Sequence, residues 1–258
     1  MRRTGFCLFL LLLVTAVRAQ TLTACADQAE MPPFTFNERF EGHKTERVVG
    51  ASVDLLRQIG RNNGWDVSIQ LLPWARCLAM VKDNRAQIAL DASRADAQEN
   101  HLIASKPYFS LHSVYFFSRR ARPQGVQLTG LNDLKHYHLC GLNGHRFEPF
   151  GIDTRDVDRG TLSYESLIAK LHLGRCDLFI ENREVIGGMY LTDPRLRTLL
   201  VDGTLVSHPL PGAANRDIMM ALSPAAANSP ALLAAINAGI AHAESNHDFE
   251  QFLSHYLD

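Results

Sequence analysis

The stretch Ala104-Ser-Lys-Pro-Tyr-Phe-Ser-Leu-His-Ser-Val-Tyr-Phe-Phe-Ser-Arg-Arg120 joins a turn to a long strand-like run and divides the chain into two halves. Pro107 fixes its own φ angle and favours an extended residue before it. The run Val114-Tyr-Phe-Phe117 is β-branched and aromatic throughout, which favours a strand buried on both faces. A charged, turn-rich segment, Arg119–Gly125, then begins a new unit. We therefore expect this stretch to cross between two lobes.

The residues before this stretch predict strand, helix, strand, helix and strand in that order, which is typical of a parallel sheet covered by helices. The expected strands are Thr21–Ala26, Trp65–Leu72 and Ile88–Leu90, and the expected helices are Gly50–Asn63 and Trp74–Val81. Asn37–Val49 is predicted as a hairpin or surface turn, and Asp91–Asn100 as a polar loop. Loops after strands of such sheets are where ligands bind.

The second half follows the same logic. Its expected strands are Tyr137–Gly141, Cys176–Ile180 and Asp217–Leu222, and its expected helices are Tyr164–Leu173 and the tail that begins at Ser229. Pro209–Asn215 contains proline and glycine and suits a second crossing between the halves.

The N-terminus has the three parts of an export signal. Arg2-Arg3 is a positive start, Gly5–Val17 is apolar, and Val17-Arg18-Ala19 is a small-residue cleavage site before Gln20. Cleavage after Ala19 would leave a soluble periplasmic protein, since no second long apolar run follows. A retained N-terminal anchor is the alternative.

Charge argues against nucleic acid as a partner. Without residues 1–19 the chain has 23 basic and 27 acidic residues, a net charge of −4. It also has no basic cluster with interleaved aromatic residues. These features favour a small-molecule partner.

Four cysteines remain after the signal, an even number that suits disulfides in an oxidising compartment. Of the three possible pairings we favour Cys25 with Cys77 and Cys140 with Cys176, because each pair lies within one half and leaves the halves free to move. An alternative is that Leu22-Thr-Ala-Cys25 is a lipoprotein cleavage box with a lipid on Cys25.

The order and spacing of several short motifs resemble the family 3 extracellular solute-binding proteins, the periplasmic amino-acid-binding type that serves ABC importers. The resemblance covers the whole mature chain. The matching motifs are Pro33-Phe34, Gly50-Ala-Ser-Val-Asp-Leu-Leu56, the aromatic Trp74, the loop Leu90–Arg94, Ile103-Ala-Ser-Lys-Pro-Tyr108 and Gly174-Arg-Cys-Asp-Leu-Phe-Ile180.

The resemblance implies an α/β protein with the two-lobed type II periplasmic-binding-protein fold and two crossing strands. Residues 20–110 and 216–258 would form the first lobe and 111–215 the second, with crossings near 110–116 and 210–216. The implied function is capture of a small polar molecule, amino-acid-like or a related metabolite, for an inner-membrane ABC permease. We expect a monomer without catalysis, cofactor or metal.

Two positions depart from the family pattern. The arginine that grips the ligand's α-carboxylate is replaced by Gln98-Glu99, although Arg94 lies earlier in the same loop. The acid that receives the ligand's ammonium group falls on Asn182, beside Glu181. We therefore expect weak binding, or none, of common free α-amino acids. A ligand with an apolar or ring surface for Trp74 and polar groups for Arg94 and Glu181 is favoured.

Loop position and resemblance together select the candidate ligand-binding residues. They are Glu30, Phe34, Trp74, Ser93, Arg94, Tyr108, Asn143, His145, Arg146, Glu181 and Asn182. Each has a plainer interpretation: the aromatic residues as ordinary core packing, and the polar ones as solvated loop or strand ends.

Two other classes of site stay open as alternatives. His136, His138 and Cys140 alternate along one expected strand, a pattern that a zinc or copper site uses, although Cys140 also has a disulfide partner. Some relatives on this fold are cyclohexadienyl dehydratases, for which Glu181 or Glu30 would be the acid. A third possibility is a ligand-sensing protein for a membrane receptor.

Overall fold

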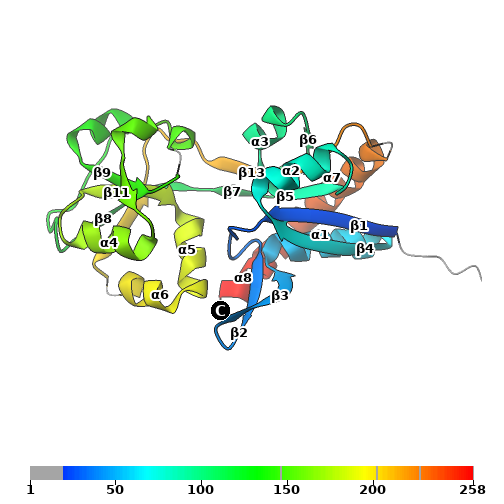
Figure 1. The fold of residues 1–258 in the computed structure, drawn as a ribbon, viewed down its shortest axis with the longest axis horizontal. Coiled ribbons are helices and arrows are strands. Elements are labelled where there is room, and N and C mark those ends of the chain that lie inside the picture. The colour runs from blue at the N-terminus through cyan, green and yellow to red at the C-terminus, as the bar shows by residue number, and fades with distance from the viewer. Residues whose placement is uncertain (1–19, 146, 202, 227, 258) are drawn as a thin grey trace, which may run out of the picture.

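The computed structural model describes residues 20–145, 147–201, 203–226 and 228–257, which form two α/β lobes side by side (Figure 1). The predicted signal peptide and Arg146 lie outside the described residues. In the part of the chain that the structure describes, no helix combines the length and the apolar character that crossing a membrane requires.

The first lobe is built on a six-stranded sheet in the order β4-β1-β5-β13-β6, with β7 also paired to β13. Strand β1 runs parallel to β4 and β5, whereas β13 runs antiparallel to β5. The strands are β1 (Gln20–Asp27), β4 (Trp65–Leu72), β5 (Ile88–Ser93), β6 (Ile103–Ala104), β7 (Phe109–Leu111) and β13 (Arg216–Leu222). A separate hairpin, β2 (Phe36–Phe40) and β3 (His43–Val49), projects from this lobe.

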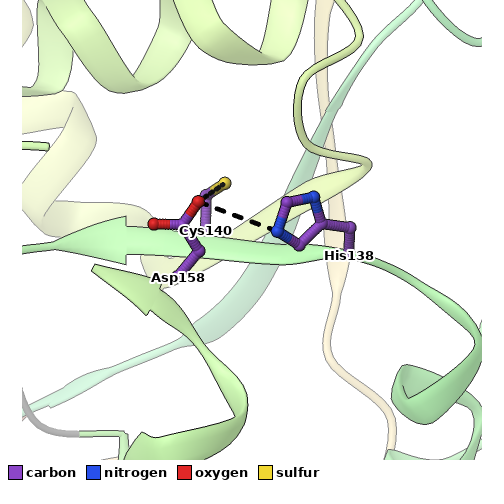
Figure 2. A group of neighbouring side chains, drawn as sticks. All are labelled: His138, Cys140 and Asp158. Atoms are coloured by element: carbon purple, nitrogen blue, oxygen red, sulfur yellow. Dashed lines mark hydrogen bonds and ion pairs between the residues drawn. The ribbon is translucent and has the colours of Figure 1, made fainter. Parts of the chain in front are cut away.

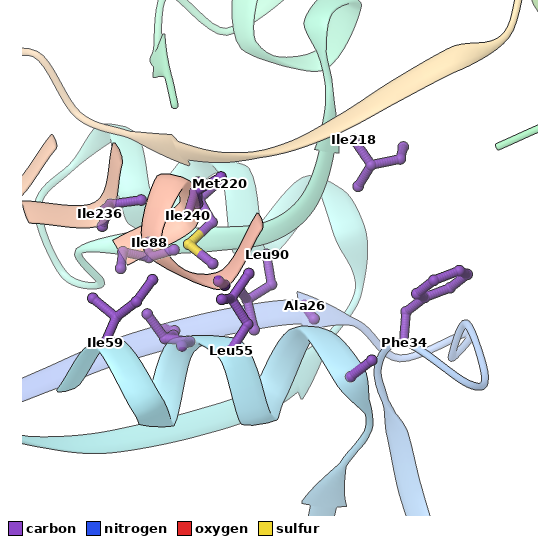
Figure 3. Packing of buried hydrophobic residues seen from close by; sticks show 14 of the residues in the cluster. Ala26, Phe34, Leu55, Ile59, Ile88, Leu90, Ile218, Met220, Ile236 and Ile240 are labelled. Carbon is purple, nitrogen blue, oxygen red and sulfur yellow. The ribbon is translucent and has the colours of Figure 1, made fainter. Parts of the chain in front are cut away.

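Helices cover this sheet and bury its apolar residues. They are α1 (Ala51–Asn63), α2 (Trp74–Lys82), α3 (Arg94–Glu99), α7 (Ser229–Asn246) and α8 (Asp248–Leu257). Leu55 and Ile59 of α1 pack with Ile88 of β5 and Ile236 of α7 in one core (Figure 3). The periodic apolar face that predicted α1 is therefore the face that anchors the helix to the sheet.

The second lobe has a five-stranded sheet in the order β10-β9-β11-β8-β12. Its strands are β8 (Ser113–Ser118), β9 (Leu139–Leu142), β10 (Asp158–Thr161), β11 (Leu178–Asn182) and β12 (Leu205–Pro209). Its helices are α4 (Tyr164–His172), α5 (Arg183–Thr192) and α6 (Pro194–Val201), with short 3₁₀ turns at Leu131–His136, Glu148–Phe150 and Thr154–Asp156. Every residue of β8 is buried, as the unbroken apolar run predicted.

Two connections join the lobes. Strand β7 belongs to the first sheet and β8 to the second, so the chain crosses next to His112. It returns between β12 and β13. The predicted two-lobed α/β fold with two crossings is confirmed, while the exact limits of the lobes stay a prediction.

The segment expected to be a polar loop, Asp91–Asn100, contains helix α3. Ser93 and Asp96 form a capping box, in which each side chain accepts a hydrogen bond from the other residue's backbone N–H. This device starts a helix even without an apolar periodic pattern, which explains why periodicity alone missed it.

Both predicted disulfides are confirmed. Cys25 bonds to Cys77 and Cys140 bonds to Cys176, so each lobe holds its own bridge. Cys25 and Cys77 are buried in the core of the first lobe, which argues against a lipid on Cys25.

Candidate functional site

A cleft of about 440 Å³ lies between the two lobes at the carboxyl ends of β1, β5 and β11. This is the position at which open α/β sheets bind ligands. First-lobe elements contribute Ala26, Asp27, Glu30, Met31, Pro32, Thr35, Trp74, Leu90, Asp91, Ser93, Asp96, Arg216 and Ile218. Second-lobe elements contribute His145, Pro149, Phe150, Tyr164, Glu181, Asn182, Val185 and Met189.

Trp74 forms one apolar wall of the cleft. It is the first residue of α2, and its indole Nε1 donates a hydrogen bond to Asp96 Oδ1 at 3.1 Å. The other carboxylate oxygen of Asp96 accepts from the Ser93 backbone N–H at 2.8 Å. The capping box of α3 thus fixes the carboxylate that orients the ring, which leaves an apolar surface facing the cleft.

Asp91 lies within β5, where the pairing with β13 is irregular, and has a left-handed backbone, φ 59°, which few residues other than glycine, asparagine and aspartate adopt. Its Oδ1 accepts hydrogen bonds from the hydroxyls of Ser52 (2.6 Å) and Tyr108 (2.6 Å), and its Oδ2 accepts one from Thr35 (2.5 Å). Burial raises the pKa of Asp91, and these hydroxyl donors offset that rise in part.

Glu181 is the buried acid of the second lobe, with 6% of its surface exposed. The Tyr164 hydroxyl donates to its Oε2 at 2.6 Å, and the Asn182 backbone N–H donates to its Oε1 at 2.7 Å. His145 Nδ1 lies 3.5 Å from Oε2. Burial raises the pKa of Tyr164, and the carboxylate of Glu181 raises it further, so this hydroxyl keeps its proton.

Glu30 is paired at the mouth of the cleft. Arg39 and Lys44 of the hairpin lie 2.7 and 2.9 Å from its Oε2, and the Asn37 backbone N–H donates to Oε1 at 3.0 Å. Burial raises the pKa of Glu30, but the hydrogen bonds from Arg39, Asn37 and Lys44 together lower it below its usual value. Glu30 is therefore an ionised carboxylate, and its contacts with Arg39, Lys44 and Asn37 attach the β2–β3 hairpin to the loop after β1.

Arg216 was not among the candidates from the sequence. It is the first residue of β13, is partly buried, and lines the cleft on the same edge as Ile218. Its Nε is buried and has no hydrogen-bond partner among the described residues. The only signal in the sequence is its place at the end of the second crossing link.

The structure brings together six of the predicted residues at the cleft: Glu30, Trp74, Ser93, His145, Glu181 and Asn182. Their roles in binding stay predictions. Four others do not line the cleft: Phe34, Arg94, Tyr108 and Asn143. Arg146 lies outside the described residues.

These four residues are placed elsewhere for physical reasons. Phe34 is buried in the first core and stacks on Phe109 with ring centroids 3.9 Å apart. Arg94 and Asn143 are exposed, on α3 and on the loop after β9. The Tyr108 hydroxyl donates a hydrogen bond to Asp91, which lines the cleft, and Tyr108 itself does not line it.

The second lobe also holds a cluster of His138, Cys140 and Asp158, whose potential ligand atoms lie within 4.8 Å of one another (Figure 2). Cys140 is in a disulfide, so its sulfur is not a thiolate. Asp158 pairs with Lys170 at 2.5 Å. His136 ends a 3₁₀ turn rather than continuing the strand, so the alternation of His136, His138 and Cys140 along one strand, an alternative that the sequence left open, is not formed.

Comparison with solved structures supports the same fold. The arginine-bound substrate-binding protein of an amino-acid ABC transporter from Streptococcus pneumoniae is 16% identical, with a TM-score of 0.66 over 92% of this chain and 94% of that one. An ancestral cationic amino acid solute-binding protein is 13% identical, with a TM-score of 0.66 over 92% and 96%. A histidine kinase sensor domain similar to periplasmic binding proteins is 20% identical, with a TM-score of 0.62 over 93% and 97%.

No curated protein matches the chain. The model of the bacterial extracellular solute-binding proteins, family 3, matches residues 23–258. The chain has this family's two-lobed type II fold, and its cleft lies where the two lobes meet. It therefore belongs to family 3 of the bacterial extracellular solute-binding proteins.

Proposed function

We propose that the mature protein captures a small amino-acid-like or related solute between its lobes and delivers it to an ABC importer in the inner membrane. The observation that carries this proposal is the cleft itself, lined by an aromatic wall from one lobe and a buried acid from the other. A ligand that touches both walls favours the closed arrangement of the lobes by its extra affinity for that arrangement.

Export is part of the proposal. The positive start, apolar run and cleavage site of residues 1–19 would direct the chain out of the cytoplasm, with cleavage after Ala19. Two disulfides suit that oxidising compartment. We infer that the protein acts there as a monomer and meets its permease at the membrane surface.

We infer binding without chemical turnover. A dehydratase would need a cleft acid that carries a proton to the leaving hydroxyl. Glu30 is unsuited, because its partners Arg39 and Lys44 hold it as a carboxylate. Glu181 accepts a hydrogen bond at each of its oxygens, from the Tyr164 hydroxyl and from the Asn182 backbone N–H, so both oxygens act as acceptors and neither as a proton donor. Incubation with prephenate or arogenate should therefore give no product.

A thermal-shift screen of residues 20–258 tests the binding function. Its probes are amino acids, polyamines, organic acids and aromatic metabolites, since ligand binding to the folded state raises its stability by about 2.7 kcal/mol at a hundredfold excess over Kd. The shift should fall in Trp74→Ala and persist in the control Phe40→Ala, which removes an exposed hairpin ring. No shift with any probe, or equal shifts in both variants, would contradict the proposal.

A further inference from the structure

The geometry points to Arg216, on the strand that returns to the first lobe, as the anion-binding residue of the cleft. This inference rests on the proposed binding function and goes beyond it by naming the residue and the ligand group that it holds. The candidate from the sequence, Arg94, is exposed and does not line the cleft.

The acids of the cleft all have partners within the protein. Glu30 pairs with two cations, and Asp91 accepts three hydroxyl hydrogen bonds. Asp96 is held by the Trp74 indole, and Glu181 by the Tyr164 hydroxyl. Asp27 accepts from the Ala29 backbone N–H.

Arg216 differs from these acids. Its Nε is buried without a hydrogen-bond partner, and no ion pair joins its guanidinium to a carboxylate within the described residues. A buried donor left unpaired loses its hydrogen bonds to water without replacement, at a greater cost for a charged group, so an external acceptor at this place would recover free energy. A guanidinium offers a planar fork of N–H groups that matches a carboxylate with two parallel hydrogen bonds.

The backbone fixes Arg216 to the first lobe. Two residues farther along β13, Ile218 pairs with Ser93 of β5, and Arg216 itself pairs with Leu111 of β7. An anion held by Arg216 would therefore bind the first lobe before closure. Closure would then bring the ligand's other end to the wall that carries Glu181.

The surrounding charge defines the ligand further. Of the five carboxylates that line the cleft, Glu30 already pairs with Arg39 and Lys44, and the other four face Arg216 and His145. A purely anionic solute would meet repulsion from that acidic wall. The ligand class is therefore a small solute with one carboxylate and at least one cationic group, which differs from the expectation from the sequence that free α-amino acids bind weakly or not at all.

Matched pairs of probes test this assignment by isothermal titration calorimetry. The pairs are L-arginine with agmatine, L-histidine with histamine, and L-phenylalanine with phenethylamine; within each pair only the carboxylate is removed. In the unmutated protein at least one acid should bind tenfold or more tighter than its amine. Arg216→Gln should lose most of that preference and Arg216→Lys should keep part of it, while Arg76→Gln, which changes an exposed arginine of α2, should keep all of it.

The outcomes separate this inference from the proposed function. Amines that bind as well as their acids, or a preference that survives Arg216→Gln, would overturn the role of Arg216 and leave solute binding intact. If Arg94→Gln loses the preference for the acid and Arg216→Gln keeps it, the carboxylate-binding role belongs to Arg94, as the sequence suggested, and not to Arg216. If no probe of any pair binds, this inference fails, and the wider thermal-shift screen alone decides the proposed function. Thermal unfolding of each variant without probe shows whether it is folded.

Discussion

Asp91 combines a left-handed backbone conformation with a buried carboxylate. Its φ of 59° suits asparagine as well as aspartate, and its carboxylate is the shared acceptor of three hydroxyl groups. Burial raises its pKa, so the charged form is less favourable in the folded protein than in the unfolded chain. Asp91 therefore orders the floor of the cleft at an electrostatic cost.

The first prediction is that Asp91→Asn stabilises the protein at neutral pH. The amide oxygen still accepts from Ser52 and Tyr108, and the amide N–H₂ can donate to the Thr35 hydroxyl. An acid whose folded pKa is raised loses stability as pH rises from the unfolded pKa, about 3.9, through the folded pKa. The advantage of Asp91→Asn in unfolding free energy should therefore grow from pH 4 towards pH 7.

Chemical denaturation of the unmutated protein and of Asp91→Asn at several pH values measures the difference between their unfolding free energies. The titration of other groups contributes equally to both proteins and cancels in this difference. Asp91→Ala is the matched comparison, because it leaves three hydroxyls without their acceptor; it should destabilise by roughly 2–4 kcal/mol near pH 4, and this deficit should shrink towards pH 7 as the unmutated protein itself loses stability. An advantage of Asp91→Asn that shrinks as pH rises would contradict the assigned pKa direction.

Trp74 and Glu181 could be selected from the sequence because each follows a strand whose end is visible in the hydrophobic pattern, and because the family resemblance points to the same positions. It missed Asp91 and Arg216 for a different reason. The partners of Asp91 come from positions 35, 52 and 108, which only the folded chain brings together. Arg216 is distinguished by a buried Nε without a hydrogen-bond partner among the described residues, and no sequence pattern shows that.

At the scale of elements, helix α5 of the second lobe faces the first lobe and contacts its Pro32 loop (Figure 1). A Cβ atom on Gly188 would lie 1.6 Å from the Pro32 carbonyl oxygen, whereas one on Gly187 would meet nothing within 4 Å. Only a glycine at position 188 allows the helix backbone and the loop after β1 to approach so closely. Pro32 also lines the cleft, so this contact helps to set the distance between the lobes.

The second prediction is that Gly188→Ala pushes the lobes apart and weakens ligand binding. The new methyl group cannot fit against the Pro32 backbone, so the arrangement in which α5 contacts the Pro32 loop becomes less populated. Gly187→Ala is the control on the same helix and should instead stabilise it by up to about 1 kcal/mol. Small-angle X-ray scattering should give a larger radius of gyration for Gly188→Ala than for Gly187→Ala. Equal radii would show that α5 yields locally and does not set the lobe distance.

Elements with a clear hydrophobic pattern could be predicted from the sequence, and the helix that starts from a side-chain cap could not. The unbroken apolar run of β8 predicted a strand, and the apolar face of α1 predicted a helix, both nearly with the observed limits. Burial on both faces gives such a run, and burial of one helix face gives a helical period. Helix α3 is six residues long with a single buried residue, and its start depends on a side-chain cap. Its sequence therefore reads as a polar loop.

At the scale of the whole molecule, the described residues form separate apolar cores. Two clusters lie in the first lobe and two in the second, and none combines residues of both. The lobes share the two crossings, the cleft and the contact of Gly188 with the Pro32 loop. Separate cores joined by short links behave as separate folding units more readily than one continuous core does.

The last prediction is that the ligand-free protein unfolds in two steps that different probes separate. Both tryptophans of the chain, Trp65 in β4 and Trp74 in α2, belong to the first lobe, so tryptophan fluorescence reports on that lobe. Circular dichroism reports on the helices of both. Replacing Cys140 and Cys176 together by alanine removes a bridge that spans 36 residues of the second lobe and should cost about 3–4 kcal/mol. In urea this variant should unfold earlier by circular dichroism, with its fluorescence midpoint unchanged. If both midpoints fall together, the lobes unfold as one unit even though their cores are separate.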